Sequence, residues 1–175
     1  REAIVAANTN TVSGAAPGEC VAGEVGLDAI QFALGGGTPS IGVIGFSLPT
    51  ITEPVLIDGA TGGATRVELN GTAGTGFALR VHSNGSTIRH LVLNRFPSSP
   101  LELRGAGNRI EGCYIGVDAA GTTAMGNKWA AIYVSGPGNV IGGTTTAARN
   151  VISGNDGAMG IYVSSFASGT VIQGN

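Results

Sequence analysis

The sequence predicts an all-β protein, a parallel β-helix: a solenoid of about 20–22 residues per coil with a short N-terminal capping helix. Three observations support this prediction. Strand-like blocks recur along the chain, Gly and Asn recur between them, and the composition is skewed. Gly makes up 31 of 175 residues and charged residues only 11%, which is typical of many short strands joined by tight turns.

The first eight residues, REAIVAAN, predict a short helix. Ala3, Ile4 and Ala7 fall at helical spacing and would form one apolar face. Because a solenoid exposes its core at both ends, we expect this helix to lie over one of them.

The segment after this helix predicts the strands of irregular first turns, at 28–34, 41–46 and 53–59. We expect one β-helix domain over the whole chain, 1–175. Its expected parts are a cap helix with a loop (1–27), irregular first coils (28–71), and regular coils that are open at the C-terminal end (72–175).

Four similar blocks define the regular coils: FALRV (77–81), PLELR (100–104), AIYV (131–134) and GIYV (160–163). A second block follows each one, and loops of variable length separate the units. Alternate residues of a strand face opposite sides, so the Leu residues of the first two blocks face inward while Arg80 and Glu102 face outward. Stacking of the coils then sets Arg80 beside Glu102 and Arg89 beside Glu111, as exposed ion pairs.

Gly and Asn mark the predicted corners, because both residues tolerate left-handed backbone angles. They stand together at 70–71, 84–85, 107–108, 138–139, 154–155 and 174–175. Asn155 and Asn175 hold the same position in NVISGN and TVIQGN, so we expect them to stack as a ladder. Cys113 holds that position in NRIEGC, where we expect a buried, inert thiol.

Longer sequence segments accompany this pattern of Gly, Asn and strand-like blocks. The N-terminal part contains REAIVAAN, Cys20, DAIQF and LPTITEPVLIDG, and the regular part contains NRIEGCYIGVDAAGTTAMGN and IGGTTTAARNVISGN. Together they resemble the bacterial CSLREA-type β-helix repeat proteins, of the pectate-lyase-like fold superfamily. The resemblance implies a right-handed, single-stranded parallel β-helix, a secreted or cell-surface location, and a cysteine upstream of Arg1 as the partner of Cys20. Cys113 stands where that family usually has Asn.

Charge and composition argue against several functions. The net charge of −2 gives no electrostatic case for nucleic acid, and no apolar run approaches a membrane-spanning length, so we expect no membrane insertion. The acidic residues are scattered, although this fold also hosts glycosidases and lyases that need clustered acids. We therefore expect no catalytic residues, no metal ligands and no cofactor, and leave open whether the chain is an enzyme.

Two groups of side chains stay open as binding sites. His82 and His90, with arginines nearby, are read either as an anion or metal site or as solvated surface. Tyr133 and Tyr162 fall at equivalent outward positions on successive coils, and Trp129 precedes them in a loop. These three aromatic residues either contact a carbohydrate or form an ordinary cross-strand pair.

The last block, TVIQGN, stops where the earlier copy NRIEGC continues with YIG. We therefore expect an uncapped C-terminal turn that pairs end to end with the same turn of a second chain, as a homodimer. The residues expected at this contact are Ile161, Val163, Val171, Ile172 and Asn175. The expected function is a non-catalytic, self-associating structural module of a larger secreted or cell-surface bacterial protein. The alternative is a polysaccharide-binding or polysaccharide-degrading β-helix.

Overall fold

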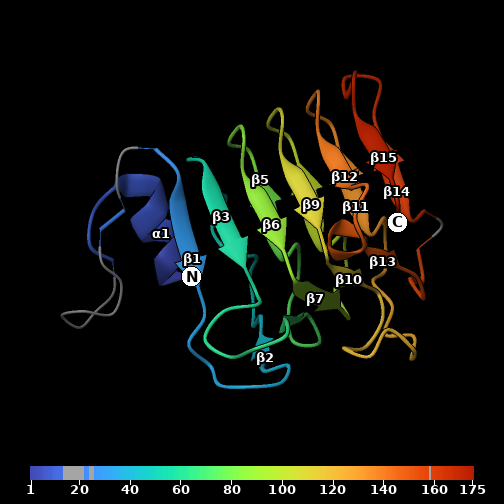
Figure 1. The fold of residues 1–175 in the computed structure, drawn as a ribbon, viewed down its shortest axis with the longest axis horizontal. Helices are drawn as coiled ribbons and strands as arrows, with labels where there is room; N and C mark the ends of the chain where they lie inside the picture. The colour runs from blue at the N-terminus through green and yellow to red at the C-terminus, as the bar shows by residue number, and fades with distance from the viewer. Residues whose placement is uncertain (14–21, 24–25, 158) are drawn as a thin grey trace.

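The computed structural model describes residues 1–13, 22–23, 26–157 and 159–175. The chain forms a parallel β-solenoid of about five turns with one short N-terminal helix, which confirms the predicted fold class. Figure 1 shows the coils stacked in chain order, with the helix beside the first coil and the C-terminal strands at the opposite end.

Three parallel sheets form the faces of the solenoid, and each coil contributes one short strand to most of them. The six-stranded sheet contains β1 (Asp28–Gln31), β3 (Val55–Asp58), β6 (Thr87–Arg89), β9 (Arg109–Glu111), β12 (Val140–Gly142) and β15 (Val171–Gln173). The five-stranded sheet contains β2 (Ser40–Gly42), β4 (Val67–Asn70), β7 (Leu91–Asn94), β10 (Tyr114–Ile115) and β13 (Val151–Ile152). The four-stranded sheet contains β5 (Leu79–Val81), β8 (Leu101–Leu103), β11 (Ile132–Val134) and β14 (Ile161–Val163).

The coils differ in length because their loops differ, while the strands stay short. In the four-stranded sheet Leu79 pairs with Leu101, Leu101 with Ile132, and Ile132 with Ile161. The first of these steps along the chain is shorter than the two that follow, and it alone fits the predicted coil of about 20–22 residues. The longer coils carry their extra residues in the predicted loops, one of which contains the 3₁₀ turn η1 (Thr146–Ala148).

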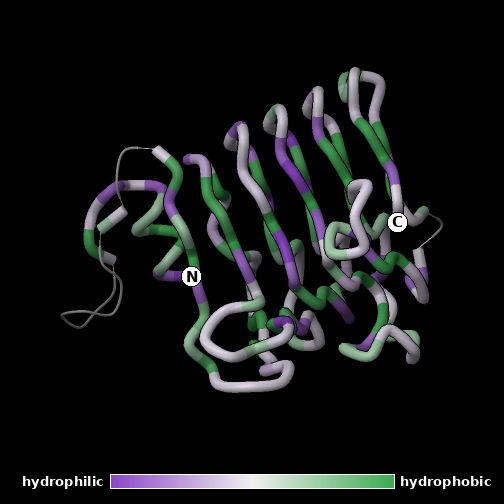
Figure 2. Tube along the Cα trace, viewed as in Figure 1, coloured by the Kyte–Doolittle hydropathy of each residue, from purple (hydrophilic) through white to green (hydrophobic). Residues whose placement is uncertain are grey.

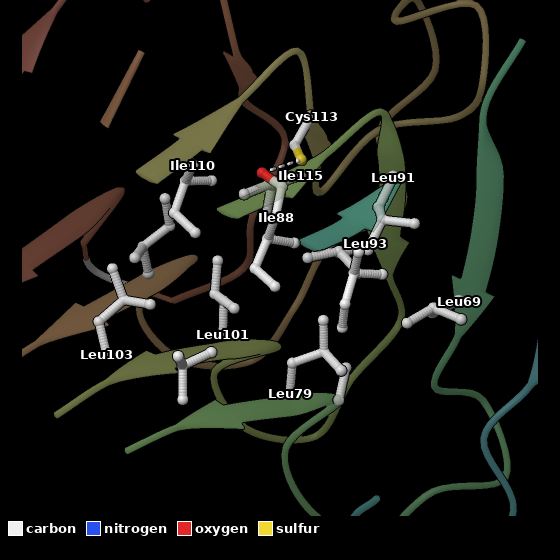
Figure 3. Packing of buried hydrophobic residues seen from close by; sticks show 14 of the residues in the cluster. Leu69, Leu79, Ile88, Leu91, Leu93, Leu101, Leu103, Ile110, Cys113 and Ile115 are labelled. Carbon is white, nitrogen blue, oxygen red and sulfur yellow. Dashed lines mark hydrogen bonds between the residues drawn. The ribbon is translucent and has the colours of Figure 1, made fainter. Parts of the chain in front are cut away.

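Inward-facing aliphatic side chains of successive coils stack into rows that form the core. One row of the six-stranded sheet consists of Ile57, Ile88, Ile110 and Ile141, each at most 3% exposed. Figure 3 shows Leu and Ile side chains from all three sheets converging in the interior. Figure 2 shows green, apolar segments along the coils, between white and purple ones. Full burial of one such side chain stabilises the fold by about 1.5–3 kcal/mol.

The helix α1 (Glu2–Thr9) covers the N-terminal end of this core, as predicted. Ile4 on its inner face is 5% exposed. Asn8 ties the helix to the first coils, because its side chain donates to the Thr50 carbonyl (2.6 Å) and accepts from the Thr52 amide (2.8 Å). Asn10 then ends the helix in the left-handed conformation (φ 52°).

The predicted strands at 28–34, 41–46 and 53–59 correspond to β1, β2 and β3, each shorter than expected. The strand β4 was not predicted, although its residues alternate in burial as a strand should. Its sequence VELN carries only two apolar residues between Gly-rich and Thr-rich segments, so its period-2 signal is short.

The expected Asn ladder forms differently from the prediction. Asn150 donates to the side-chain oxygen of Asn175 (2.8 Å), whereas Asn127 donates to that of Asn155 (2.8 Å). The predicted stacking of Asn155 on Asn175 is therefore wrong. The two similar hexapeptides fold into different sheets, with β13 in the five-stranded sheet and β15 in the six-stranded one. Cys113 does lie next to this ladder, since its amide donates to Asn150 Oδ1 (2.9 Å).

Candidate functional site

Three aromatic side chains form a cluster on the outer face of the four-stranded sheet. Tyr133 of β11 and Tyr162 of β14 are register partners. Their rings lie 5.2 Å apart between centroids and within 5° of parallel. Trp129, in the loop before β11, lies 5.6 Å from the ring of Tyr133 and 5.9 Å from that of Tyr162. We call these three residues the aromatic cluster.

Local sequence explains how the cluster forms. Both strands read IYV, so the aliphatic residues face inward and the central tyrosine faces outward. The backbone of Trp129 approaches the next coil closely at Gly157, where a Cβ atom would lie 2.2 Å from the Trp129 carbonyl oxygen. An ion pair beside the loop, from Lys128 Nζ to Asp156 (2.6 Å), joins the same two coils.

Polar side chains follow the aromatic cluster on the same sheet, toward the first coils: Glu102 of β8 and then Arg80 of β5. Glu102 pairs in register with Tyr133 on one side and with Arg80 on the other, as predicted for Arg80. Glu102 is only 3% exposed, however, so the prediction of an exposed pair is wrong. Its carboxylate accepts a hydrogen bond from Arg104 Nε (2.9 Å) and lies 3.5 Å from His82 Nε2. Arg104 reaches Glu102 because residues i and i+2 of a strand share a face.

The second predicted pair lies on the six-stranded sheet. Arg89 is the register partner of Glu111, and their side chains are 4.0 Å apart. Arg89 contacts Asp58 more closely, at 2.9 Å from Nε and 2.8 Å from a terminal nitrogen. Asp58 also accepts from His90 Nδ1 (2.8 Å) and the Ala60 amide (2.9 Å).

These contacts perturb the acidity of Asp58. Burial raises its pKa, but the hydrogen bonds from His90, the Ala60 amide and Arg89 outweigh burial and leave the pKa below its ordinary value. Asp58 is therefore held ionised beside the Arg89 guanidinium and the His90 ring.

The two histidines do not form one site. His82 lies beside Glu102 and His90 beside Asp58, on different corners of the solenoid. His90 is half-buried and hydrogen-bonded to Asp58, which corrects its interpretation as solvated surface, whereas His82 is exposed, as that interpretation expects. Each histidine does have an acidic neighbour, which the sequence analysis did not predict. Within residues 1–13, 22–23, 26–157 and 159–175, no group of three or more His, Cys, Asp or Glu side chains is placed to hold a metal ion.

The residues expected at the self-association contact lie in the last turn. Val163, Val171 and Ile172 are 42%, 42% and 46% exposed. Ile161 is half-buried and Asn175 is exposed. Their strands β14 and β15 are the terminal strands of their sheets in this chain.

The Cys113 thiol is buried in the core, as predicted, and burial raises its pKa to about 12. Figure 3 shows its sulfur beside the Ile88 carbonyl, 3.8 Å away. Cys20, the other cysteine, lies outside the described residues.

A scan against models of protein families found no match, and searches of curated proteins and of solved structures found none either. The resemblance to CSLREA-type proteins therefore stays a prediction, and so do the location and partners that it implies. Among the described residues, no helix has both the length and the apolar character that crossing a membrane requires.

Proposed function

We propose that the protein is a non-catalytic binding module that holds a carbohydrate on the outer face of its four-stranded sheet. One observation carries the proposal: three aromatic rings lie close together there, with centroids 5.2 to 5.9 Å apart, and Trp129 is 41% exposed. Exposed aromatic side chains supply apolar contact area with a polar end, a combination suited to sugar rings.

Polar groups beside the aromatic cluster suit the hydroxyl groups of the same ligand. Arg104 is well exposed, with 58% of its side-chain surface accessible, and its guanidinium is oriented by Glu102. A side chain that is already held in place loses little conformational entropy on binding, which favours affinity. The polar residues lie one coil from Tyr133, a spacing of about 4.8 Å between neighbouring strands.

Two features of Glu102 support binding without catalysis: which residues lie beside it in the sheet, and which groups its carboxylate contacts. A glycosidase places two carboxyl groups on either side of the bond it cleaves, about 5–9.5 Å apart. The register partners of Glu102 are Arg80 and Tyr133, and its carboxylate is already engaged by Arg104 and His82. We therefore assign Glu102 an orienting role.

A polysaccharide array followed by calorimetric titration of each hit tests this proposal. Trp129→Ala should weaken binding by about 2 kcal/mol or more, as truncation of a central aromatic contact does. Phe46→Ala is the matched control, because Phe46 is 83% exposed and lies outside the aromatic cluster. An array without hits, or affinity that is equal in Trp129→Ala and wild type, contradicts the proposal.

A second candidate function, self-association of the 175-residue chain, rests on the apolar last turn. Its strand residues Val163, Val171 and Ile172 are exposed. Residues 157–175 contain no charged side chain and no histidine, although exposed strand edges commonly carry charges that block pairing. The partner we propose is the same turn of a second copy, in a two-fold arrangement that closes.

Light scattering of the 175-residue chain between about 5 and 100 μM, a range typical of weak dimers, tests the second candidate. Ile172→Lys should abolish the dimer. Ile44→Lys is the control, because Ile44 is 75% exposed in the loop that follows β2. A monomer at every concentration, or a dimer that survives Ile172→Lys in a folded chain, rules out this contact.

The setting proposed for both functions is a larger secreted or cell-surface protein. Its support is the sequence resemblance, since the solenoid itself is compatible with many functions.

A further inference from the structure

A basic pocket lies on the corner between the six-stranded and five-stranded sheets, away from the aromatic cluster. Its volume is about 360 Å³, and its lining includes Arg66, His90, Tyr114, Thr146 and Arg149. Arg66, His90 and Arg149 stand shortly before β4, β7 and β13, while Tyr114 begins β10. Four coils of the solenoid thus contribute to one cavity.

The two arginines that line this pocket, Arg66 and Arg149, have no acidic partner among the residues that the structure describes. Arg89, Arg95 and Arg109 each lie within 4.0 Å of a carboxylate. Across the described ranges, by contrast, neither Arg66 nor Arg149 forms an ion pair. Uncompensated guanidinium groups give the pocket a positive charge and free donors that suit an anion.

Arg66 is held in position before any ligand arrives. Its Nε donates to the Gly112 carbonyl (3.2 Å), and its guanidinium carbon lies 3.8 Å from the centroid of the Tyr114 ring. These contacts occupy Nε and one face of the guanidinium plane. The terminal nitrogens keep their donors, so a bound anion would meet a fixed cation rather than a mobile one.

His90 stands at a position where neighbouring coils use glycine. The register of Asp58, Arg89 and Glu111 places Gly59, His90 and Gly112 at the same corner. His90 adopts φ 54° there, close to the 63° of Gly112. A non-glycine residue in this left-handed region is strained, and such strain is typically kept where a side chain has a task.

The task we infer for His90 is to face the ligand. Its Nδ1 is hydrogen-bonded to Asp58 at 2.8 Å, which fixes the orientation of the ring. The other ring nitrogen, Nε2, is then left to contact the ligand. Gly112 makes room for the ring, because a Cβ atom there would lie 2.7 Å from His90 Cδ2. Nε2 can donate to an anion when the ring is protonated, and it can accept from the P–OH of monohydrogen phosphate when the ring is neutral.

We propose that this pocket binds a tetrahedral oxyanion, a phosphate or sulfate that is free or carried as an ester. Two arginines and a histidine line the pocket, and the nearby acids are already paired: Asp58 with Arg89 and His90, and Glu111 with Arg89 and Arg109. The cavity of about 360 Å³ exceeds a bare ion and suits an ester of about monosaccharide size.

Calorimetric titration of the 175-residue chain with inorganic phosphate, sodium sulfate, glucose 6-phosphate and sodium acetate tests the proposal. Low ionic strength is needed because salt screens charge–charge attraction. Arg66→Gln should weaken phosphate or sulfate binding about tenfold or more, as expected when a charge-assisted hydrogen bond is lost. Arg149→Gln, which changes an exposed side chain, should weaken it about threefold.

Two further variants separate binding from folding. Lys128→Gln removes the same charge at another corner, where Lys128 pairs with Asp156, and should leave anion binding unchanged. His90→Gly copies the corner residue of the adjacent coils, so the fold should survive while affinity falls. Saturable binding of a tetrahedral anion that is lost in Arg66→Gln and His90→Gly supports the proposal.

Three results would overturn it. One is no saturable binding of any tetrahedral anion up to about 20 mM, above the range of specific weak sites. Another is binding that is the same in Arg66→Gln, Arg149→Gln and wild type. The third is an affinity for acetate equal to that for phosphate and sulfate, which would mean that the pocket binds anions in general and does not select tetrahedral ones. Tighter binding of glucose 6-phosphate than of inorganic phosphate would identify an ester as the ligand, and the reverse order would identify the free ion.

Discussion

Replacing Asp58 by Asn tests the electrostatic network that fixes the corner beside β3 and β6. The Asp58 carboxylate accepts hydrogen bonds from Arg89 Nε, His90 and the Ala60 amide, and a terminal nitrogen of Arg89 forms an ion pair with it; all four distances are between 2.8 and 2.9 Å. Asn keeps a single acceptor oxygen and no charge. Its amide nitrogen then faces donors, so at least one partner loses its acceptor.

The expected cost of Asp58→Asn follows from this geometry. Removing one partner of a fully buried ion pair costs about 3–5 kcal/mol. The Arg89 side chain is 36% exposed, so solvent screens its interaction with Asp58. We expect about 2 kcal/mol at pH 7 after this discount, and a loss of about 4–8 °C in Tm for a chain of this length.

The pH dependence gives the sharper test. The pKa of Asp58 is lower in the folded chain than its ordinary value of 3.8. A lowered folded pKa means that the stabilisation is fully present above pH 3.8 and is lost as the pH falls through the folded pKa. The difference in Tm between wild type and Asp58→Asn should therefore be constant from about pH 5 to 7 and shrink below pH 3.8.

Thermal unfolding followed by circular dichroism at pH 7, 5 and 3 measures this difference, with Asp156→Asn as the control. Asp156 pairs with Lys128 but is 52% exposed, and exposed pairs contribute about 1 kcal/mol at most. Equal stability of Asp58→Asn and wild type at pH 7, or a difference that persists undiminished at pH 3, would refute the reasoning.

The packing leads to three more predictions. Gly157→Ala should displace the Trp129 loop, because the added Cβ would lie 2.2 Å from the Trp129 carbonyl oxygen; a red shift in tryptophan emission would report it, and an unchanged spectrum would contradict it. The Cys113 thiol, whose pKa burial raises to about 12, should resist iodoacetamide in the folded chain at pH 8 and react after unfolding in urea, as peptide mapping can check. Ile141→Ala should cost about 2–5 kcal/mol in urea unfolding because Ile141 is fully buried, whereas its register partner Ile172, 46% exposed, should cost less than about 1 kcal/mol in a monomer.

The sequence predicts the solenoid well because its signals are local. The alternation in FALRV, PLELR, AIYV and GIYV decides which residues of each block face outward, and parallel stacking brings these residues together. Arg80 and Glu102, and likewise Tyr133 and Tyr162, therefore fall into register as expected. The register does not decide which neighbour a charged, outward-facing side chain pairs with. Glu102 forms its ion pairs with Arg104 and His82 instead of Arg80.

The sequence offered His90 as part of an anion or metal site, but it did not predict Arg66 and Arg149 as the partners of His90, because coils of unequal length join these residues. Tyr114 of β10 is the register partner of Val92 in β7 and of Val151 in β13, and the second of these lies much further from it along the chain. No fixed period relates Arg66, His90 and Arg149, so their spacing carries no signal. A signal exists once the register is known: His90 stands where the adjacent coils have glycine.

The misplaced Asn ladder has a similar cause. NVISGN and TVIQGN share a pattern because each is a short strand followed by a Gly-Asn corner. A three-sided coil contains more than one such corner, so equal phrases need not lie on equal faces. Asn155 belongs with Asn127 and Asn175 with Asn150.

The most direct test of the proposed function uses the single tryptophan of the chain. Trp129 is the only residue of its type and is 41% exposed within the aromatic cluster, so its fluorescence reports on this face alone. A carbohydrate that binds in calorimetry should shift or quench this emission, with a midpoint equal to the calorimetric Kd. Saturable carbohydrate binding that leaves the emission of Trp129 unchanged would contradict the proposal, because the ligand would then lie elsewhere on the solenoid.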